Sequence, residues 1–144
     1  MIRLCITLVL LASLSMAVCA QKAYTPKQGS LERKAIMETM RKQCEKMLGQ
    51  KVVFVVSHLK VQSGWAFSTG VPRQPNGKKI DYLKTQFREY VELGVFDDSY
   101  CTLLTKVGKT WKVKRFLIGM TDVPWVVWPK EFGAPKGIFP GAGG

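Results

Sequence analysis

The amino-acid sequence predicts an α+β fold, in which an N-terminal helix packs on a four-stranded antiparallel curved sheet, with a short inserted helix and a short C-terminal helix. Apolar residues recur at spacings of three and four over residues 30–48, as they do on one face of a helix. Two pairs of strand-like segments follow, and a two-residue turn containing glycine joins each pair. Antiparallel hairpins with helices on one side make an α+β domain.

Length and composition bound the organisation of the chain. It has 144 residues, which suits a single domain, and 47% of them are apolar, which excludes a disordered basic tail. We expect a signal peptide over 1–20, an extended lead-in over 21–29, one α+β domain over 30–135 and an irregular tail over 136–144.

Residues 1–20 have the pattern of a secretory signal peptide. Arg3 provides a positive charge, an apolar run follows over 4–14, and small residues precede the expected cleavage after Ala20. Cleavage after Ala17 is the alternative. The run is shorter than the about 20 residues that a spanning helix needs, so we expect no transmembrane segment.

Cys19 leaves lipidation as a second fate for the mature N-terminus. A small residue normally precedes the acylated cysteine of a lipoprotein, whereas β-branched Val18 stands here, so ordinary cleavage is favoured. We expect an exported protein, either periplasmic or secreted.

Cys44 and Cys101 are the cysteines that remain after cleavage at the expected site. In an oxidising compartment they can form one disulfide, and the alternative is two buried free thiols. The chain has a single His, so a zinc site built on these two cysteines is not expected. We expect neither a metal nor a cofactor.

The predicted N-terminal helix begins after Ser30, a good N-cap residue, and stops at Gly49. Its charged residues lie mostly off the apolar stripe, so we interpret them as a solvated helix face.

The first predicted hairpin joins residues 51–62 to 65–71 through Ser63 and Gly64. The run from Val52 to Val56 is apolar at every position, so we expect the centre of its first strand to be covered on both sides. After a turn-rich loop, apolar residues return at helical spacing and predict the inserted helix over 80–92.

The second predicted hairpin joins 100–107 to 110–118. Apolar residues in its last strand change parity halfway, and a bulge near Lys114 and Arg115 would return them to one side of the sheet. The residues concerned are Trp111, Val113, Phe116 and Ile118.

The predicted C-terminal helix covers 122–128 and carries Trp125 and Trp128 on one face, at i, i+3 spacing. The simpler interpretation is that these rings cover an open end of the sheet. The alternative is that they bind a partner or a sugar.

Several short motifs together resemble a family of small exported bacterial proteins that is uncharacterised. They are Gly29-Ser30-x-x-Arg33-x-x-Ile36, Val53-Phe54-Val55-Val56-x-x-Leu59-x-Val61, Gly64-Trp65-Ala66-Phe67, Pro72-x-x-Pro75-x-Gly77 and Leu103-Leu104-x-Lys106-x-Gly108-x-x-Trp111-x-Val113. The resemblance spans 28–118, and 80–96 departs from it. It implies a bacterial envelope setting. The helix-on-sheet arrangement is also similar to a reduced cystatin or nuclear-transport-factor-2 fold, which implies no function.

His58 is the single histidine of the chain. It alternates with Phe54 and Val56, so we expect it on their face of the sheet. A His–Asp pair with Asp81, Asp97 or Asp98 could act as acid and base, but a strand-end His without a catalytic role is favoured. The phosphate-loop, Gly-x-Ser-x-Gly and His-Glu-x-x-His motifs are missing from the sequence, so we assign no catalytic residue.

Positive charge is the clearest functional signal. The chain carries 22 Lys and Arg against 10 Asp and Glu, a net charge of +12. The second predicted hairpin holds a basic cluster of Lys106, Lys109, Lys112, Lys114 and Arg115. Lys112 and Lys114 alternate with Trp111 and Val113, so we expect them on the opposite, solvent-facing side of the strand. Basic residues on a strand also discourage aggregation through sheet edges.

These features favour an exported, non-enzymatic binding or inhibitor-type protein. It would contact an acidic protein or an anionic envelope component through Lys106, Lys112, Lys114 and Arg115, with Trp125 and Trp128 as further candidates. Nucleic acid is not expected as a partner for two reasons. We expect the protein to be exported, and its basic residues do not alternate with aromatic residues on one recognisable surface. The alternative is a small enzyme or ligand-binding protein with a pocket between helix and sheet near His58.

Overall fold

The computed structural model describes residues 20–141, so most of the predicted signal peptide, with Cys19, lies outside the described residues. The helices are α1 (Leu31–Leu48), α2 (Arg88–Glu92) and α3 (Trp128–Phe132), and the strands are β1 (Val53–Gln62), β2 (Trp65–Arg73), β3 (Tyr100–Val107) and β4 (Thr110–Ile118). The four strands form one antiparallel sheet in the order β1-β2-β3-β4. The predicted α+β fold is confirmed.

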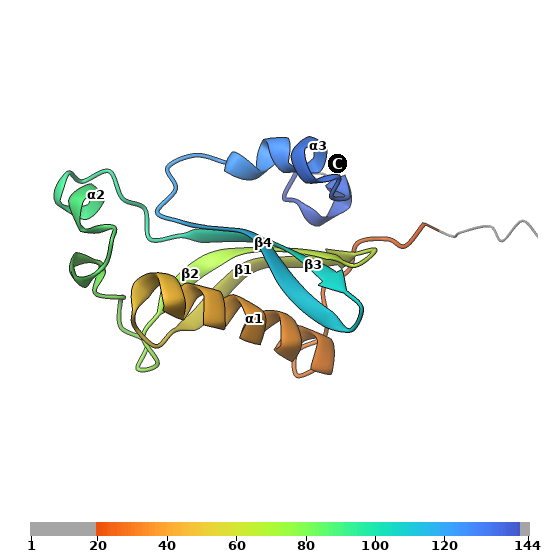
Figure 1. Cartoon of the computed structure of the whole chain (residues 1–144), viewed down its shortest axis with the longest axis horizontal. Coiled ribbons are helices and arrows are strands. Elements are labelled where there is room, and N and C mark those ends of the chain that lie inside the picture. The colour runs from red at the N-terminus through yellow and green to blue at the C-terminus, as the bar shows by residue number, and fades with distance from the viewer. Residues whose placement is uncertain (1–19, 142–144) are drawn as a thin grey trace, which may run out of the picture.

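The sheet lies between two covering layers, with α1 on one face and α3 and the C-terminal segment on the other (Figure 1). Each face therefore has its own hydrophobic core. The α1 core contains Ile36, Met40, Cys44, Leu59, Val61, Leu104, Trp111, Phe116 and Ile118, among others. The second core contains Phe67, Cys101, Leu103, Trp128, Ala134, Ile138 and Phe139.

The C-terminal segment differs from the prediction. A 3₁₀ turn over Pro124–Val127 precedes α3, and a further 3₁₀ turn over Lys136–Ile138 stands where we predicted an irregular tail. Ile138 is fully buried and Phe139 is 6% exposed. Strand alternation points Phe67 and Leu103 away from α1, and burying these side chains requires a second cover.

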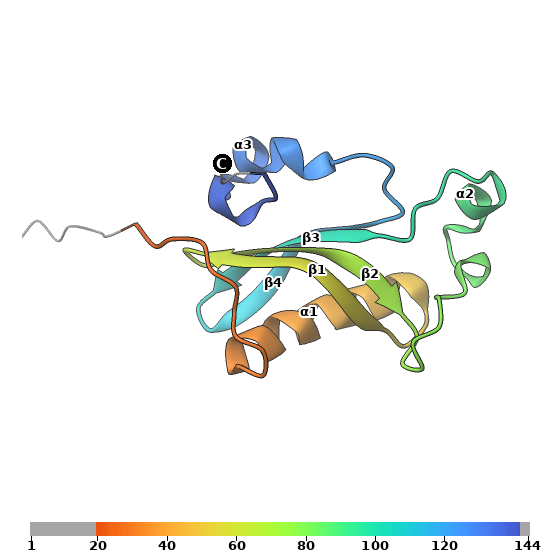
Figure 2. The same cartoon turned by 180° about the vertical axis from the view of Figure 1, so that it is seen from behind.

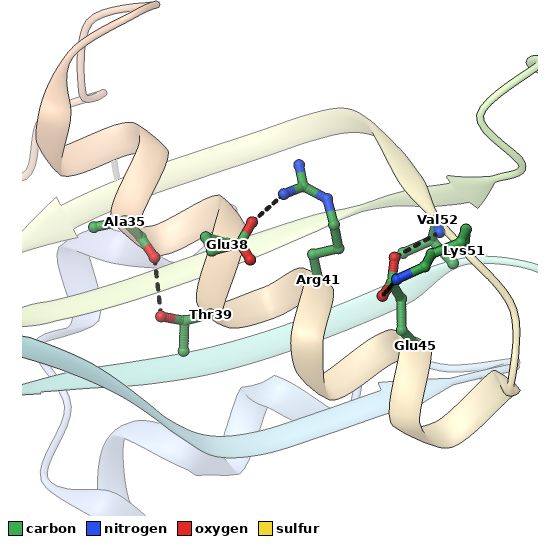
Figure 3. A network of polar contacts seen from close by, with 7 residues as sticks. All are labelled: Ala35, Glu38, Thr39, Arg41, Glu45, Lys51 and Val52. Atoms are coloured by element: carbon green, nitrogen blue, oxygen red, sulfur yellow. Dashed lines mark hydrogen bonds and ion pairs between the residues drawn. The ribbon is translucent and has the colours of Figure 1, made fainter.

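The caps and a side chain of α1 fix both of its ends. Ser30 Oγ accepts a hydrogen bond from the Arg33 N–H at 3.2 Å, and Gly49 ends the helix in the left-handed region at φ 64°. Glu45 reaches past this end and accepts hydrogen bonds from the Val52 N–H and the Lys51 ammonium, each at 3.1 Å (Figure 3). The Val52 hydrogen bond, with smaller contributions from Lys51 and Arg41, lowers the pKa of Glu45.

The predicted bulge in β4 is confirmed. Val113 pairs with Leu104 and Arg115 pairs with Leu103, so Lys114 is the extra residue. The four apolar side chains of β4 on either side of the bulge consequently all pack towards α1.

A second bulge, in β1, was not predicted and turns His58 to the other face. Val56 pairs with Gly70 and His58 pairs with Thr69, so Ser57 is the extra residue. Phe54 and Val56 lie against the α1 core, whereas the His58 ring packs at 5.8 Å from Phe67 in the second core. The face predicted for His58 is therefore wrong, because a bulge inverts the alternation beyond it.

The predicted cover on both sides of β1 is also wrong. β1 is an edge strand, and Val53 and Val55 are 38% and 57% exposed on the face away from α1. The C-terminal segment covers the sheet around Phe67 and does not reach this end of β1.

The disulfide between Cys44 and Cys101 is absent, and both side chains are buried free thiols. Cys44 belongs to the α1 core and Cys101 to the second core, so the sheet separates them. Burial raises the pKa of each thiol to about 12.

The inserted segment forms two short pieces in place of the continuous helix predicted over 80–92: a 3₁₀ turn over Tyr82–Lys84 and then α2. Thr85 separates them, because its hydroxyl donates to the Tyr82 carbonyl at 2.7 Å and accepts from the Phe87 N–H at 3.1 Å. Figures 1 and 2 show this segment beyond one end of the sheet.

Candidate functional site

His58 connects β1 to the C-terminal segment. Its Nε2 lies 2.7 Å from the Ile138 carbonyl oxygen, and since a carbonyl oxygen only accepts, Nε2 is the donor. Among residues 20–141, this carbonyl is the only hydrogen-bond partner of the ring. The ring therefore holds Ile138 over Phe67, which is a structural role.

The candidate acids lie on the inserted segment and near the start of β3, and they line one hollow of about 510 Å³ there. Asp81 pairs with Lys84 at 3.2 Å, and Asp98 pairs with Arg73 at 3.0 Å. Asp97 accepts a hydrogen bond from the Ser99 N–H. Within the described chain, no hydrogen bond or ion pair joins an acid to His58, so the structure does not bring the predicted acid–base set together.

Lysines from three elements lie beside Trp111, where the end of α1 lies beside β4. Lys42, Lys46 and Lys112 line one hollow with Trp111. Lys112 alternates with Trp111 and Val113 in β4, so its side chain leaves the strand on the opposite face. The Lys106 ammonium lies 5.8 Å from the centre of that ring, within the range of a cation–π contact. We call the surface that Lys42, Lys46, Lys106 and Lys112 form beside Trp111, which is itself only 4% exposed, the Trp111 basic surface.

No acid compensates the charge of this surface. Its other lining residues are uncharged, namely Thr39, Gln43, Thr110 and Val113. The nearest acids of α1 are already paired, Glu38 with Arg41 and Glu45 with Lys51 (Figure 3). Among residues 20–141, none of the four lysines forms an ion pair, so they create a region of positive potential beside Trp111.

The remaining predicted partner-binding residues lie elsewhere. Arg115 turns to the second face, where its guanidinium pairs with Glu131 at 2.8 Å and lies 5.4 Å from the centre of the Phe132 ring. Lys114 is exposed at the β4 bulge. The five basic residues of this hairpin therefore do not form one face.

Trp125 and Trp128 pack against Phe67, with ring centres 5.5 and 6.0 Å away. Trp128 is 3% exposed and belongs to the second core. This placement agrees with the structural interpretation of the tryptophans, except that they cover a face of the sheet and not its end.

Lys42 and Lys46 are the site residues that the sequence analysis missed. They are four positions apart on α1, so the helical period places them on one side of the helix. That period was a usable signal for a shared surface, but it did not indicate that this side adjoins β4.

No set of three or more His, Cys, Asp or Glu side chains in the described part of the chain is placed to hold a metal ion. None of the helices within 20–141 has the length and apolar character needed to cross a membrane.

Comparisons of the chain with protein-family models, with curated proteins and with solved structures found no match.

Proposed function

We propose that this chain is an exported, non-enzymatic binding protein of the inhibitor type that contacts an acidic protein or an anionic envelope component through the Trp111 basic surface. The observation that carries the proposal is that four lysines from α1, β3 and β4 lie beside Trp111 and form no ion pair among residues 20–141. Such a surface accelerates and orients the encounter with an acidic partner.

The partner surface proposed here is narrower than the basic strand predicted from the sequence. Lys106 and Lys112 stay in it, whereas Lys114, on the bulge, is not among the residues that line its hollow. Arg115 contributes less, because Glu131 already neutralises its charge. Export rests on the sequence pattern of residues 1–20, and the bacterial envelope setting on the family resemblance.

Two triple variants with equal net charge test this proposal. The surface variant carries Lys42→Glu, Lys46→Glu and Lys112→Glu. The control carries Lys22→Glu, Lys78→Glu and Lys130→Glu, at exposed lysines of three other segments. The probe is immobilised poly-L-glutamate at physiological salt.

We expect the control variant to keep most of the retention on poly-L-glutamate and the surface variant to lose it. Retention of the unsubstituted protein should fall as salt rises. Equal losses in the two variants would contradict the proposal, because binding would then follow net charge alone.

A further inference from the structure

The outer edge of β1 offers backbone groups to another strand. The lead-in pairs with this edge at one point, where Tyr24 and Val61 exchange N–H to carbonyl hydrogen bonds of 2.9 and 2.8 Å. Figure 2 shows the N-terminal segment passing one end of the sheet before it turns into α1. Over the described residues, no other segment pairs with the outer edge of β1 between residues 53 and 60. An unpaired edge of this kind is a template for an added strand.

A groove follows the same edge. α1 packs chiefly against β4, which leaves a hollow of about 790 Å³ between α1 and β1. Met37, Phe54 and Val56 give the hollow apolar walls. A smaller hollow of about 240 Å³ shares Arg33 and Val56 with it and continues along β1 to Lys60. The two hollows together make a trough beside the unpaired backbone.

The charges along the trough favour an acidic occupant. Arg33, Lys34, Arg41 and Lys60 line it, and Glu38, the one acid among its lining residues, is paired with Arg41 (Figure 3). The Arg33 guanidinium is held in place by a hydrogen bond to the Pro26 carbonyl at 3.2 Å. A second copy of this chain is disfavoured, because pairing two β1 edges would bring these cations against each other.

We propose that this trough binds an extended acidic peptide segment of a partner protein, which adds to β1 as a fifth strand. Alternate side chains of the peptide would face α1, where acidic groups meet Arg33 and Lys34. The intervening side chains would lie beside Val53 and Val55 on the opposite face, where apolar residues are preferred. The proposal does not rest on the Trp111 basic surface, which lies on the β4 side of α1.

The first test is selection from a library of short peptides in which Asp or Glu alternates with Val, Ile, Thr or Tyr, against a matched library with Lys in the acidic positions. We expect binders from the acidic library alone. The amide signals of Phe54, Val56 and Leu59 should shift in NMR spectra when the best binder is added. The proposal would be overturned if the acidic library gave no more binders than the basic library.

The second test separates strand addition from simple charge attraction. Methylating alternate amide nitrogens of the best binder, on the edge that faces β1, should abolish binding, whereas methylation on the other edge should leave it unchanged. Arg33→Gln with Lys34→Gln should weaken binding roughly tenfold, and Lys42→Gln with Lys46→Gln should not. The proposal would be overturned if methylation of either edge of the peptide had the same effect on binding. A stable dimer of the free protein through β1 would also overturn it.

Discussion

At Gly70 the fold leaves no room for a side chain. A Cβ atom there would lie 2.1 Å from the Val55 carbonyl oxygen and 3.1 Å from the Tyr100 ring. We predict that Gly70→Ala lowers the free energy of unfolding by about 3 kcal/mol, because backbone cannot move aside as a flexible side chain can. Guanidinium unfolding measures the loss, and Thr69→Ala is the control in the same strand. A loss below about 1 kcal/mol would contradict this account of the site.

The two thiols give a second prediction about single residues. A chain that begins at Gln21 contains only Cys44 and Cys101. Both thiols are buried and the pKa of each is raised to about 12, so we expect neither to react with a thiol reagent in the folded protein at neutral pH. Both should react after unfolding without a reductant. If the unfolded protein reacted with the thiol reagent only after a reductant was added, the cysteines would be joined by a disulfide. That result would contradict their separation by the sheet.

The roles of single residues could be predicted where neighbouring residues in the sequence determine them. Ser30 caps α1 as expected, and the parity change between Val113 and Phe116 revealed the β4 bulge. The β1 bulge at Ser57 was missed because every residue from Val52 to Val56 is apolar, so the run has no alternation to interrupt. The face of His58 depended on that bulge and was therefore wrong.

At the scale of elements, the C-terminal segment is part of the core. Ile138 is fully buried against the second face of the sheet, so Ile138→Ala should lower the free energy of unfolding by about 2–5 kcal/mol. Val126→Ala is the matched aliphatic control, since Val126 is 68% exposed in the same segment. Equal effects of the two substitutions on denaturant unfolding would show that the segment is not packed as described.

Glu45 connects α1 to the start of β1, and this contact makes stability depend on pH. Hydrogen bonds lower the pKa of Glu45 in the folded protein, so the carboxylate stabilises the fold above its unfolded pKa. That stabilisation is lost as the pH falls through the lowered folded pKa. Glu45→Gln should therefore destabilise the protein at neutral pH and converge with the unsubstituted protein below about pH 4.

Thermal unfolding across the acid range measures this dependence on pH. Glu38→Gln is the control, because Glu38 makes an exposed ion pair on the same helix. A difference between Glu45→Gln and the unsubstituted protein that persists unchanged into acid would contradict the role of the carboxylate.

Helices and strands could be predicted where apolar residues recur with a regular period. How these elements pack against one another could not be predicted from the sequence. The stripe of α1 and the two hairpins follow from alternation and turn residues. The spacing of Trp125 and Trp128 indicated one apolar face in the C-terminal segment, but it did not indicate that this face packs on the second face of the sheet. The position of α1 over β4 was equally undetermined, and it decides that Lys42 and Lys46 join Lys112.

For the whole molecule, the positive charge is divided among distinct surfaces. Arg115 helps to hold the C-terminal segment through Glu131, while Arg33 and Arg41 line the β1 trough. The Trp111 basic surface combines four lysines of helix and sheet, which form no ion pair among the described residues, with a cation–π contact to Trp111. This surface is accordingly the central element of the proposed binding function.

Photo-crosslinking from Thr110 tests that function most directly, because this exposed residue lines the hollow of the Trp111 basic surface. A photoreactive residue at Thr110, in protein mixed with the envelope fraction of the source organism, should form one dominant adduct with an acidic component. The adduct should disappear when Lys42, Lys46 and Lys112 are replaced by Glu. The same photoreactive residue at Lys78, on a distant loop, should not form it. Equal adducts from both positions, or an adduct that survives the three substitutions, would contradict the proposed function.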